Sequence, residues 1–408
     1  MPQQSESRIR VSPSPLTADL VAWRRDCVKW ENDDLQFNIP ALNSLALSSL
    51  VCLYDEEKLL FSRNITLTEC GLRREGTSWK GTIIALLGLR HLCDSGCALP
   101  FDVARIQESI LGDVSRVKSV GDLGLLTWLT AVCAPDRLEI LLSRFDWRKA
   151  VDSYSDARQA RTRGLSWFLA GLAHARLACP GLLPELTDVA VEAYHLLQDN
   201  QGENGIFGHG APRSFVGEML WNRYGTFADQ IHAIYALSKF ACAFEIEEPL
   251  EIALNCANSV CAHQGELGQW WFRYDKRRGC VASHYPVCSA HQDGMAPTAL
   301  LALQEGTGQN FHDQIWKGLK WIAVQNELGT DLRSLDPGLI WDSIEPQRRV
   351  AEYWETACNY LHVSSEPQVK RLKIRYEARP HHFGWLLYAF GKLGVGSKQF
   401  SAKAATTH

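Results

Sequence analysis

FADQIHAIYALSKF, residues 227–240, carries small and apolar side chains on nearly every side. A helix with that pattern has to be buried all round. Five other segments share it: SWKGTIIALLGLRHL (78–92), GDLGLLTWLTAV (121–132), GLSWFLAGLAHARL (164–177), HQDGMAPTALLAL (291–303) and HHFGWLLYAFGKL (381–393). Their small residues permit neighbouring helices to approach closely. The sequence therefore predicts six buried helices.

More amphipathic segments alternate with the six buried ones. They cover residues 102–111, 136–150, 184–198, 248–262, 312–326 and 348–362. Self-similarity of this kind indicates a repeat architecture. We therefore predict an all-α fold, an (α/α)6 toroid in which about six outer helices shield six inner ones. The alternative is an irregular helical protein without a ring.

The predicted toroid is a single domain that covers residues 39–395. Residues 1–38 are expected to form a short N-terminal extension, a tail followed by a helix, and residues 396–408 a disordered C-terminal tail. Within the toroid, Leu42–Asp55 has the pattern of a helix. Residues 58–76 alternate enough to predict a short hairpin or an extended connection.

The composition excludes several classes of function. The 408 residues are 46% hydrophobic, and 42 basic and 46 acidic residues are mixed along the chain, which argues against a nucleic-acid partner. No apolar run is long enough for an integral membrane segment, and the N-terminus lacks an apolar signal region. The 13 cysteines lack metal-site spacing. We expect a cytoplasmic protein with no metal, no cofactor and a small-molecule or oligomeric substrate; its oligomeric state cannot be predicted.

Two turns share the spacing Q-x-x-x-G-x-aromatic, QGENGIF at 201–207 and QGELGQW at 264–270. Each follows an amphipathic segment and precedes a buried one. The glycine can adopt the left-handed or tight-turn conformation that ends a helix. The glutamine amide can satisfy open carbonyls there, and the aromatic ring can cover the turn. Both turns are therefore predicted to be structural clamps.

The same phrase is the QW motif of squalene–hopene and related triterpene cyclases. The chain resembles these cyclases at Gln201, Gly205 and Phe207, and again at Gln264, Gly268 and Trp270. The resemblance implies an α/α toroid and isoprenoid cyclisation. The DxDD acid motif of those cyclases is absent, since ENDD at 31–34 lies outside the predicted ring, and DDxxD is absent too. No catalytic residue is carried over, so the resemblance concerns the fold.

In a ring of helical hairpins, the inner helices all start at one end and face a shared cavity. Carboxylates and histidines at these starts could transfer protons, and an arginine could bind an anionic group. The predicted catalytic residues are Asp122, Asp229, His291, Asp293 and His382. The predicted substrate-binding residues at the same rim are Trp79, Arg163, Gln230, Gln292, Tyr376, Glu377, Arg379 and His381.

Two long aromatic loops, 208–225 and 270–289, precede the fourth and fifth inner helices. Long loops at one rim of a scaffold often bind ligands, and aromatic faces can stabilise carbocations or stack on sugars. These loops add Trp221, Tyr224, Trp270, Trp271 and Tyr285 to the predicted substrate-binding residues. Structural alternatives are loop packing for these aromatics, helix caps for Asp122 and Asp293, and an ion pair for Glu377 and Arg379.

The main functional prediction is an isoprenoid cyclase-like enzyme. An Asp–His pair, such as Asp293 with His291, would protonate the substrate in an aromatic cavity. The alternative is a carbohydrate-active enzyme on the same toroid (a polysaccharide lyase, uronosyl epimerase or glycosidase) using groups such as Arg379 and His382. A non-catalytic binding toroid is the third hypothesis. The sequence contains no P-loop, GxGxxG, HExxH or GxSxG motif, which disfavours nucleotide, zinc-protease and α/β-hydrolase chemistry.

Overall fold

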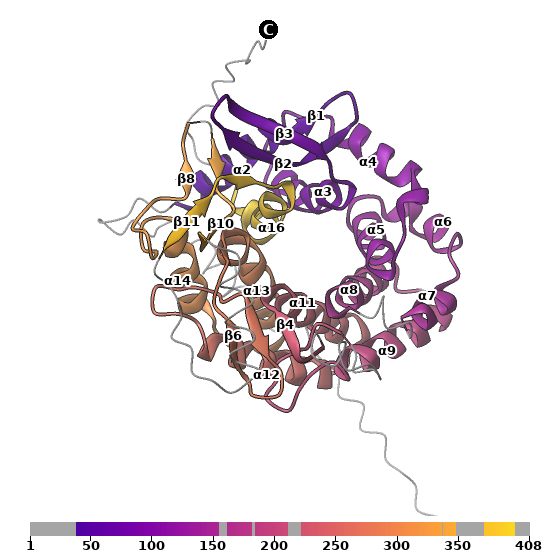
Figure 1. Ribbon diagram of the computed structural model, residues 1–408. Coiled ribbons are helices and arrows are strands. Elements are labelled where there is room, and N and C mark those ends of the chain that lie inside the picture. The colour runs from indigo at the N-terminus through magenta and orange to yellow at the C-terminus, as the bar shows by residue number, and fades with distance from the viewer. Residues whose placement is uncertain are drawn as a thin grey trace, which may run out of the picture.

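The computed structural model of the protein describes residues 38–154, 161–181, 184–210, 222–336, 338–347 and 371–395. In Figure 1 their helices form two concentric layers around one axis. The inner helices are α3 (Trp79–Asp94), α5 (Val120–Cys133), α8 (Thr162–Ala178), α11 (Phe227–Phe244), α13 (Ala296–Thr307) and α16 (Pro380–Phe390). The outer helices are α2 (Ile39–Leu53), α4 (Val103–Gly112), α6 (Leu138–Leu142), α7 (Trp147–Ser153), α9 (Pro184–Gln198), α12 (Glu248–Ala262) and α14 (His312–Ile322). The predicted (α/α)6 toroid is confirmed.

The ring closes between the first and last described helices. Asn43 of α2 donates from Nδ2 to the carbonyl oxygens of Phe390 (2.9 Å) and Gly394 (2.7 Å), at the other end of the chain. Helix α2 thus supplies an outer helix beside α16. The outer helix predicted at 348–362 lies outside the described residues, as do the predicted tails, apart from residue 38.

Neighbouring inner helices approach so closely that only glycine fits at their contacts. A Cβ on Gly124 of α5 would lie 2.3 Å from the Cα of Phe168 in α8, and one on Gly171 would lie 2.3 Å from the carbonyl oxygen of Gly124. At the contact between α3 and α16, a Cβ on Gly88 would lie 2.2 Å from the carbonyl oxygen of Gly384. The close approach of neighbouring helices that was predicted from the small residues is therefore confirmed.

The two Q-x-x-x-G-x-aromatic turns are built alike, and the predicted clamp is confirmed. In each, the glutamine amide donates to the turn glycine and to the following outer helix. The bonds run from Gln201 Nε2 to Gly205 O (2.9 Å) and Ile252 O (3.0 Å), and from Gln264 Nε2 to Gly268 O (3.1 Å) and Gln314 O (2.9 Å). Both glycines have positive φ, +81° and +98°. Each clamp thus also ties one repeat to the next.

Four small antiparallel sheets complete the described fold. They comprise β1 (Tyr54–Asp55), β2 (Leu60–Thr68), β3 (Gly71–Thr77) and β12 (Glu377–Ala378); β7 (Val287–Cys288), β10 (Ser343–Pro346) and β11 (Leu372–Arg375); β4 (Tyr224–Thr226), β5 (Arg273–Asp275) and β6 (Cys280–Ser283); and β8 (Arg333–Ser334) and β9 (Leu339–Ile340). Only the β2–β3 hairpin was predicted, at residues 58–76. Strands β3, β4 and β12 end just before α3, α11 and α16, so two of the sheets lie near inner-helix starts.

Short helical turns fill several connections between the long helices. They are the 3-10 turns η1 (Val114–Arg116), η2 (Pro135–Arg137) and η4 (Gly391–Leu393), and the π-helical turn η3 (His291–Met295). The predicted outer helix at 136–150 is divided into η2, α6 and α7. The turn η3 runs directly into α13, so the fifth inner helix begins with a widened turn. Such π turns frequently occur at functional sites.

Candidate active site

The start of α16 meets the π turn η3 at a buried histidine–aspartate pair. Pro380 occupies the first turn of α16, as predicted, and places His382 there. His382 Nε2 lies 2.8 Å from Oδ1 and 2.9 Å from Oδ2 of Asp293, and both side chains are fully buried. Asp293 is therefore not a helix cap, contrary to the structural alternative considered above.

The pair is arranged for proton transfer. Burial raises the pKa of Asp293, and the hydrogen bond and charge of His382 oppose this shift. When Asp293 is ionised, it accepts the Nε2–H of His382 and leaves the Nδ1 lone pair available. That Nδ1 atom is buried and has no hydrogen-bond partner in the part of the chain that the structure describes. A carboxylate that fixes the tautomer of a histidine also stabilises its protonated form.

Asp229, at the start of α11, has one engaged oxygen and one without a partner. Its Oδ2 accepts from the backbone N (2.8 Å) and Oγ1 (2.7 Å) of Thr226 and from Nδ1 of His209 (2.9 Å). Burial acts to raise the pKa of Asp229, but His209, Arg163 and Thr226 lower it overall. No described residue forms a hydrogen bond with the buried Oδ1. Asp229 is therefore a charged cap with one oxygen left to accept a proton or a hydrogen bond.

Three further histidines interact electrostatically with Asp229 or with His382 and are neutral at neutral pH. Burial, with a contribution from the Arg163 charge, lowers the pKa of His232, His291 and His381 to about 3. Within the described part of the chain, His232 Nε2 and His291 Nδ1 are buried without a hydrogen-bond partner. Because Arg163 influences all three pKa values, the starts of α8, α11, η3 and α16 share one electrostatic environment.

Two tryptophan rings pack against His232 in the site. The rings of Trp167 and Trp385 each lie 5.3 Å from the ring of His232, centroid to centroid. The indole nitrogens of Trp79, Trp167 and Trp385 are buried without a hydrogen-bond partner among the described residues. Buried polar atoms are nearly always paired in proteins. The unpaired atoms gathered at these inner-helix starts therefore mark the candidate site.

Several predicted site residues are engaged in holding the structure. Asp122 accepts from Ser119 Oγ (2.9 Å) and the backbone N of Lys118 (3.1 Å) through Oδ2, and its Oδ1 lies 2.7 Å from Lys80 Nζ. Glu377 accepts from Arg379 Nη2 (2.9 Å), the ion pair named as the structural alternative.

Gln230 and Gln292 have equivalent structural contacts. Gln230 accepts from Phe207 N (2.7 Å) and donates to Phe207 O (2.8 Å). With its amide oriented to match its neighbours, Gln292 donates to Gly268 O (2.9 Å) and accepts from Trp270 N (3.1 Å). Each therefore fixes the end of one clamp turn. This explains why an amide occurs at the start of both α11 and η3.

The predicted loop aromatics pack within the loops. Trp270 is fully buried and its ring stacks at 5.2 Å on Phe227, while Trp271 lies 6.0 Å from Tyr285, whose hydroxyl donates to Glu327 (3.0 Å). Tyr224 is buried in β4. Trp221 lies outside the described residues. Tyr376, with 45% of its surface exposed, meets the ring of Trp341 edge-on at 5.2 Å.

The residue-by-residue analysis of the sequence missed several members of the site. His209 pairs with Asp229, and Trp167 and Trp385 contact His232, but none of them was among the predicted site residues. The two tryptophans could have been predicted from the sequence, since both lie in the first two turns of buried segments. His209 could not, because it comes from the loop before α11.

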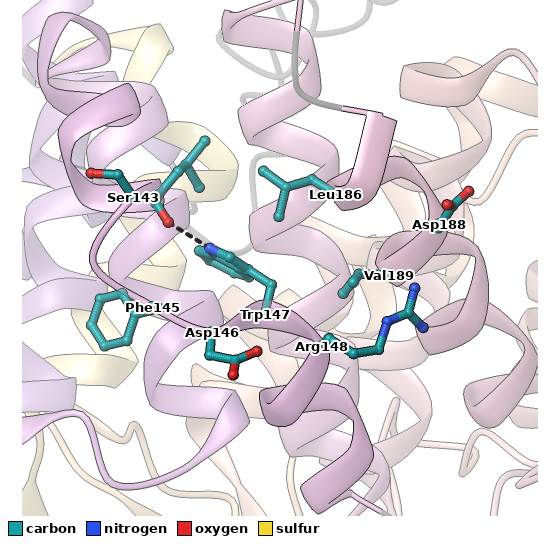
Figure 2. A pocket seen from close by; sticks show the side chains of 9 residues that line it. Ser143, Phe145, Asp146, Trp147, Arg148, Leu186, Asp188 and Val189 are labelled. Carbon is teal, nitrogen blue, oxygen red and sulfur yellow. Dashed lines mark hydrogen bonds between the residues drawn. The ribbon is translucent and has the colours of Figure 1, made fainter.

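A cavity of about 460 Å³ lies in the outer layer between α6, α7 and α9 (Figure 2). Several of its polar groups serve the local structure. Trp147 Nε1 donates to Leu142 O (2.7 Å), Asp146 accepts from Lys149 N (2.9 Å), and Arg148 pairs with a glutamate of α9. None of the described polar atoms that line this cavity is buried without a partner, unlike those at the inner-helix starts, so we do not assign the chemistry to it.

Two kinds of feature are absent from the described residues. No helix there is both long enough and apolar enough to span a bilayer. No three side chains of His, Cys, Asp or Glu in that part of the chain are grouped so that they could hold a metal ion.

Fold and site together define an α/α toroid with acid and base groups at its inner-helix starts. No protein-family model matches the sequence, and no curated protein matches it. Solved structures do match. One is a possible member of the GH105 family from Salmonella enterica serovar Paratyphi A, with TM-score 0.55, 12% identity, and 89% of this chain and 95% of that chain covered.

Two other similar structures are those of a sugar hydrolase and a sugar epimerase. An unsaturated glucuronyl hydrolase from Bacillus sp. GL1, described as responsible for glycosaminoglycan degradation, has TM-score 0.55 and 13% identity, over 86% of this chain and 94% of that one. A sugar epimerase from a ruminal bacterium has TM-score 0.54 and 9% identity, over 87% of this chain and 100% of that one. At these identities the likeness establishes the fold alone.

The prediction of an isoprenoid cyclase is wrong, because the similar toroids are glycoside hydrolases and an epimerase. The reason is physical. The phrase that suggested cyclases is a clamp between helix ends, and any toroid of stacked helical hairpins can use it. The alternative prediction, a carbohydrate-active protein, agrees better with these structures.

Proposed function

We propose that the protein is a carbohydrate-active enzyme that moves a proton at a sugar carbon, as an epimerase or a lyase does. The observation that carries this proposal is the Asp293–His382 pair with its unpartnered Nδ1. An oriented imidazole is a suitable base for a C–H bond next to a carbonyl or carboxyl group. The similar toroids, which include a sugar epimerase, support the substrate class.

The proposed proton transfer requires no cofactor. His382 Nδ1 removes the proton, and the electrons of the broken C–H bond move onto the adjacent carbonyl oxygen as an enediolate. The indole N–H groups of Trp167 and Trp385 are available to hold that oxygen. In an epimerisation, a proton from solvent adds to the opposite face of the carbon, and His382 releases the proton it took to solvent. In a lyase reaction, a leaving oxygen departs and takes the proton.

Hydrolysis of a glycosidic bond fits the site less well. That reaction uses two carboxyl groups, one as acid and one as base or nucleophile. Both oxygens of Asp293 are held by His382, and both oxygens of Asp122 are engaged near the start of α5. Of these three acids, Asp229 alone has an oxygen with neither a hydrogen bond nor an ion pair within the described residues.

Incubation with oligosaccharides in D2O tests the proposal. Reducing disaccharides and uronic-acid disaccharides would be followed by NMR for deuterium at the carbon next to the carbonyl or carboxyl group. We expect exchange with the wild-type protein and a loss of at least about 100-fold in His382→Gln. His195→Gln, on outer helix α9, is the matched control and should keep full exchange.

Two outcomes would contradict the proposal. Release of a monosaccharide with no deuterium on carbon would indicate hydrolysis. Saccharide binding without exchange or cleavage across the panel would indicate a non-catalytic toroid.

A further inference from the structure

A cavity of about 290 Å³ lies between the starts of α3, α5 and α8. Four cationic side chains line it: Lys80, Lys118, Arg161 and Arg163. The ring of Trp167 forms part of its wall, with the Arg163 guanidinium carbon 5.3 Å from the ring centroid. We call it the basic cavity.

The positive charge of the basic cavity is largely uncompensated within the described residues. Asp122 is the carboxylate at this position, and it lies 2.7 Å from Lys80. The side chains of Lys118, Arg161 and Arg163 form no ion pair there. This local excess of positive charge contrasts with the formal net charge of the whole chain, which is −4. Like charges gathered around a concavity repel one another, and an anion in the concavity relieves that repulsion.

A solvated surface is the structural alternative, because single exposed lysines and arginines rarely bind anything specific. Two observations speak against it. The four side chains come from three different inner-helix starts yet line one hollow, instead of being spread over a convex face. Two of them are arginines, whose planar guanidinium groups match the oxygens of phosphate and sulfate.

The basic cavity adjoins the candidate active site. Trp167 contacts the basic cavity, and its ring also lies 5.3 Å from that of His232. The charge of Arg163 reaches the same site, since it lowers the pKa of both His232 and His291. A group held in the basic cavity would therefore lie on the α3–α5–α8 side of the Asp293–His382 pair, away from the reacting carbon.

We propose that the basic cavity binds a compact tetrahedral oxyanion, a phosphate or sulfate ester carried by the saccharide substrate. This inference rests on the proposed function for the substrate, although anion binding itself does not require turnover. A phosphate monoester offers up to two negative charges and three acceptor oxygens to the three unpaired cations. A neutral saccharide would leave those charges unused.

Calorimetric titration of the full-length protein with inorganic phosphate and with inorganic sulfate, each at low ionic strength, tests this inference. We expect saturable binding of at least one anion, weakened at least about tenfold in the double variant Lys118→Ala/Arg161→Ala. The two ions distinguish the ester classes. Arg90→Ala, at the other end of α3 and paired with Asp94, is the matched control and should bind like the wild type.

The result also separates this inference from the proposed function. His382→Gln should keep anion binding while it loses deuterium exchange. Anion binding that depends on Lys118 and Arg161 in a protein without exchange activity would support the basic cavity alone. Absence of saturable binding of either ion by the wild-type protein, or equal binding by the double variant, would overturn the inference.

Discussion

His382 Nε2 contacts both carboxylate oxygens of Asp293 at 2.8 and 2.9 Å, across 89 positions of sequence. This contact depends on the close packing of η3 against α16. Gly294, the next residue along η3, lies so near α16 that an added Cβ would stand 2.9 Å from both Leu386 N and Trp385 Cβ. The geometry of the acid–base pair is therefore set partly by a glycine.

Replacement of this glycine should disturb the pair without removing it. In Gly294→Ala the new methyl group has to displace the backbone of α16, so we expect a loss of about 1–3 kcal/mol in unfolding free energy. Deuterium exchange should fall more than stability alone explains. Urea denaturation and the NMR exchange assay measure the two effects. Gly112→Ala is the control, because an added Cβ there meets nothing within 4 Å.

Buried histidines should make the protein sensitive to mild acid. His232 and His291 have a pKa of about 3 in the folded protein, against 6.5 as the ordinary value. Between these values the unfolded chain binds a proton that the folded chain does not, so stability falls as the pH drops below about 6.5. Each histidine should cost about 2 kcal/mol at pH 5 relative to neutral pH.

Denaturant unfolding at pH 7 and pH 5 measures this effect. The raised pKa of Asp293 acts in the opposite direction, because there the folded state binds the proton more readily. A comparison of wild type with His232→Gln and His291→Gln isolates the histidine contribution. Each variant should lose less stability between the two pH values than the wild type does. Equal losses would show that these histidines are protonated in the folded protein.

The clamp glutamines should contribute stability without affecting chemistry. Gln264→Ala removes two hydrogen bonds, one within the turn and one to α14, and leaves the carbonyls of Gly268 and Gln314 without this donor. We expect unfolding free energy to fall by about 1–3 kcal/mol. Gln309→Ala, which removes an exposed side-chain contact, should change it by less than about 0.5 kcal/mol. A large loss of saccharide binding in a folded Gln264→Ala protein would contradict a purely structural role.

The architecture could be predicted because a helix that is buried on every side consists almost entirely of small and apolar residues. The same small residues, such as Gly124 and Gly88, allow the close helix contacts seen in the structure. The sheets could not be predicted as well, because strands such as β7 and β12 have two residues each and pair across long stretches of chain. Local patterns do not encode such pairings.

The site could be predicted only as a set of positions at inner-helix starts. Asp293 and Asp229 look alike in sequence, each beside a glutamine at a helix start. In the structure one is held by His382 and the other by Thr226 and His209. Those partners come from the fold. The chemistry was misassigned for a related reason, since the most recognisable motif serves packing.

Substitution of the carboxylate tests whether the aspartate orients the histidine. Asn at position 293 keeps the shape but offers His382 an amide, which no longer favours the tautomer with a proton on Nε2. The imidazolium also loses its stabilising charge. We expect deuterium exchange in Asp293→Asn to fall by about 10³-fold or more, while stability is maintained or increased because a buried charge is removed. NMR of the His382 ring nitrogens should show the proton moved toward Nδ1. Retention of the wild-type tautomer and exchange rate would show that Asp293 merely packs beside His382.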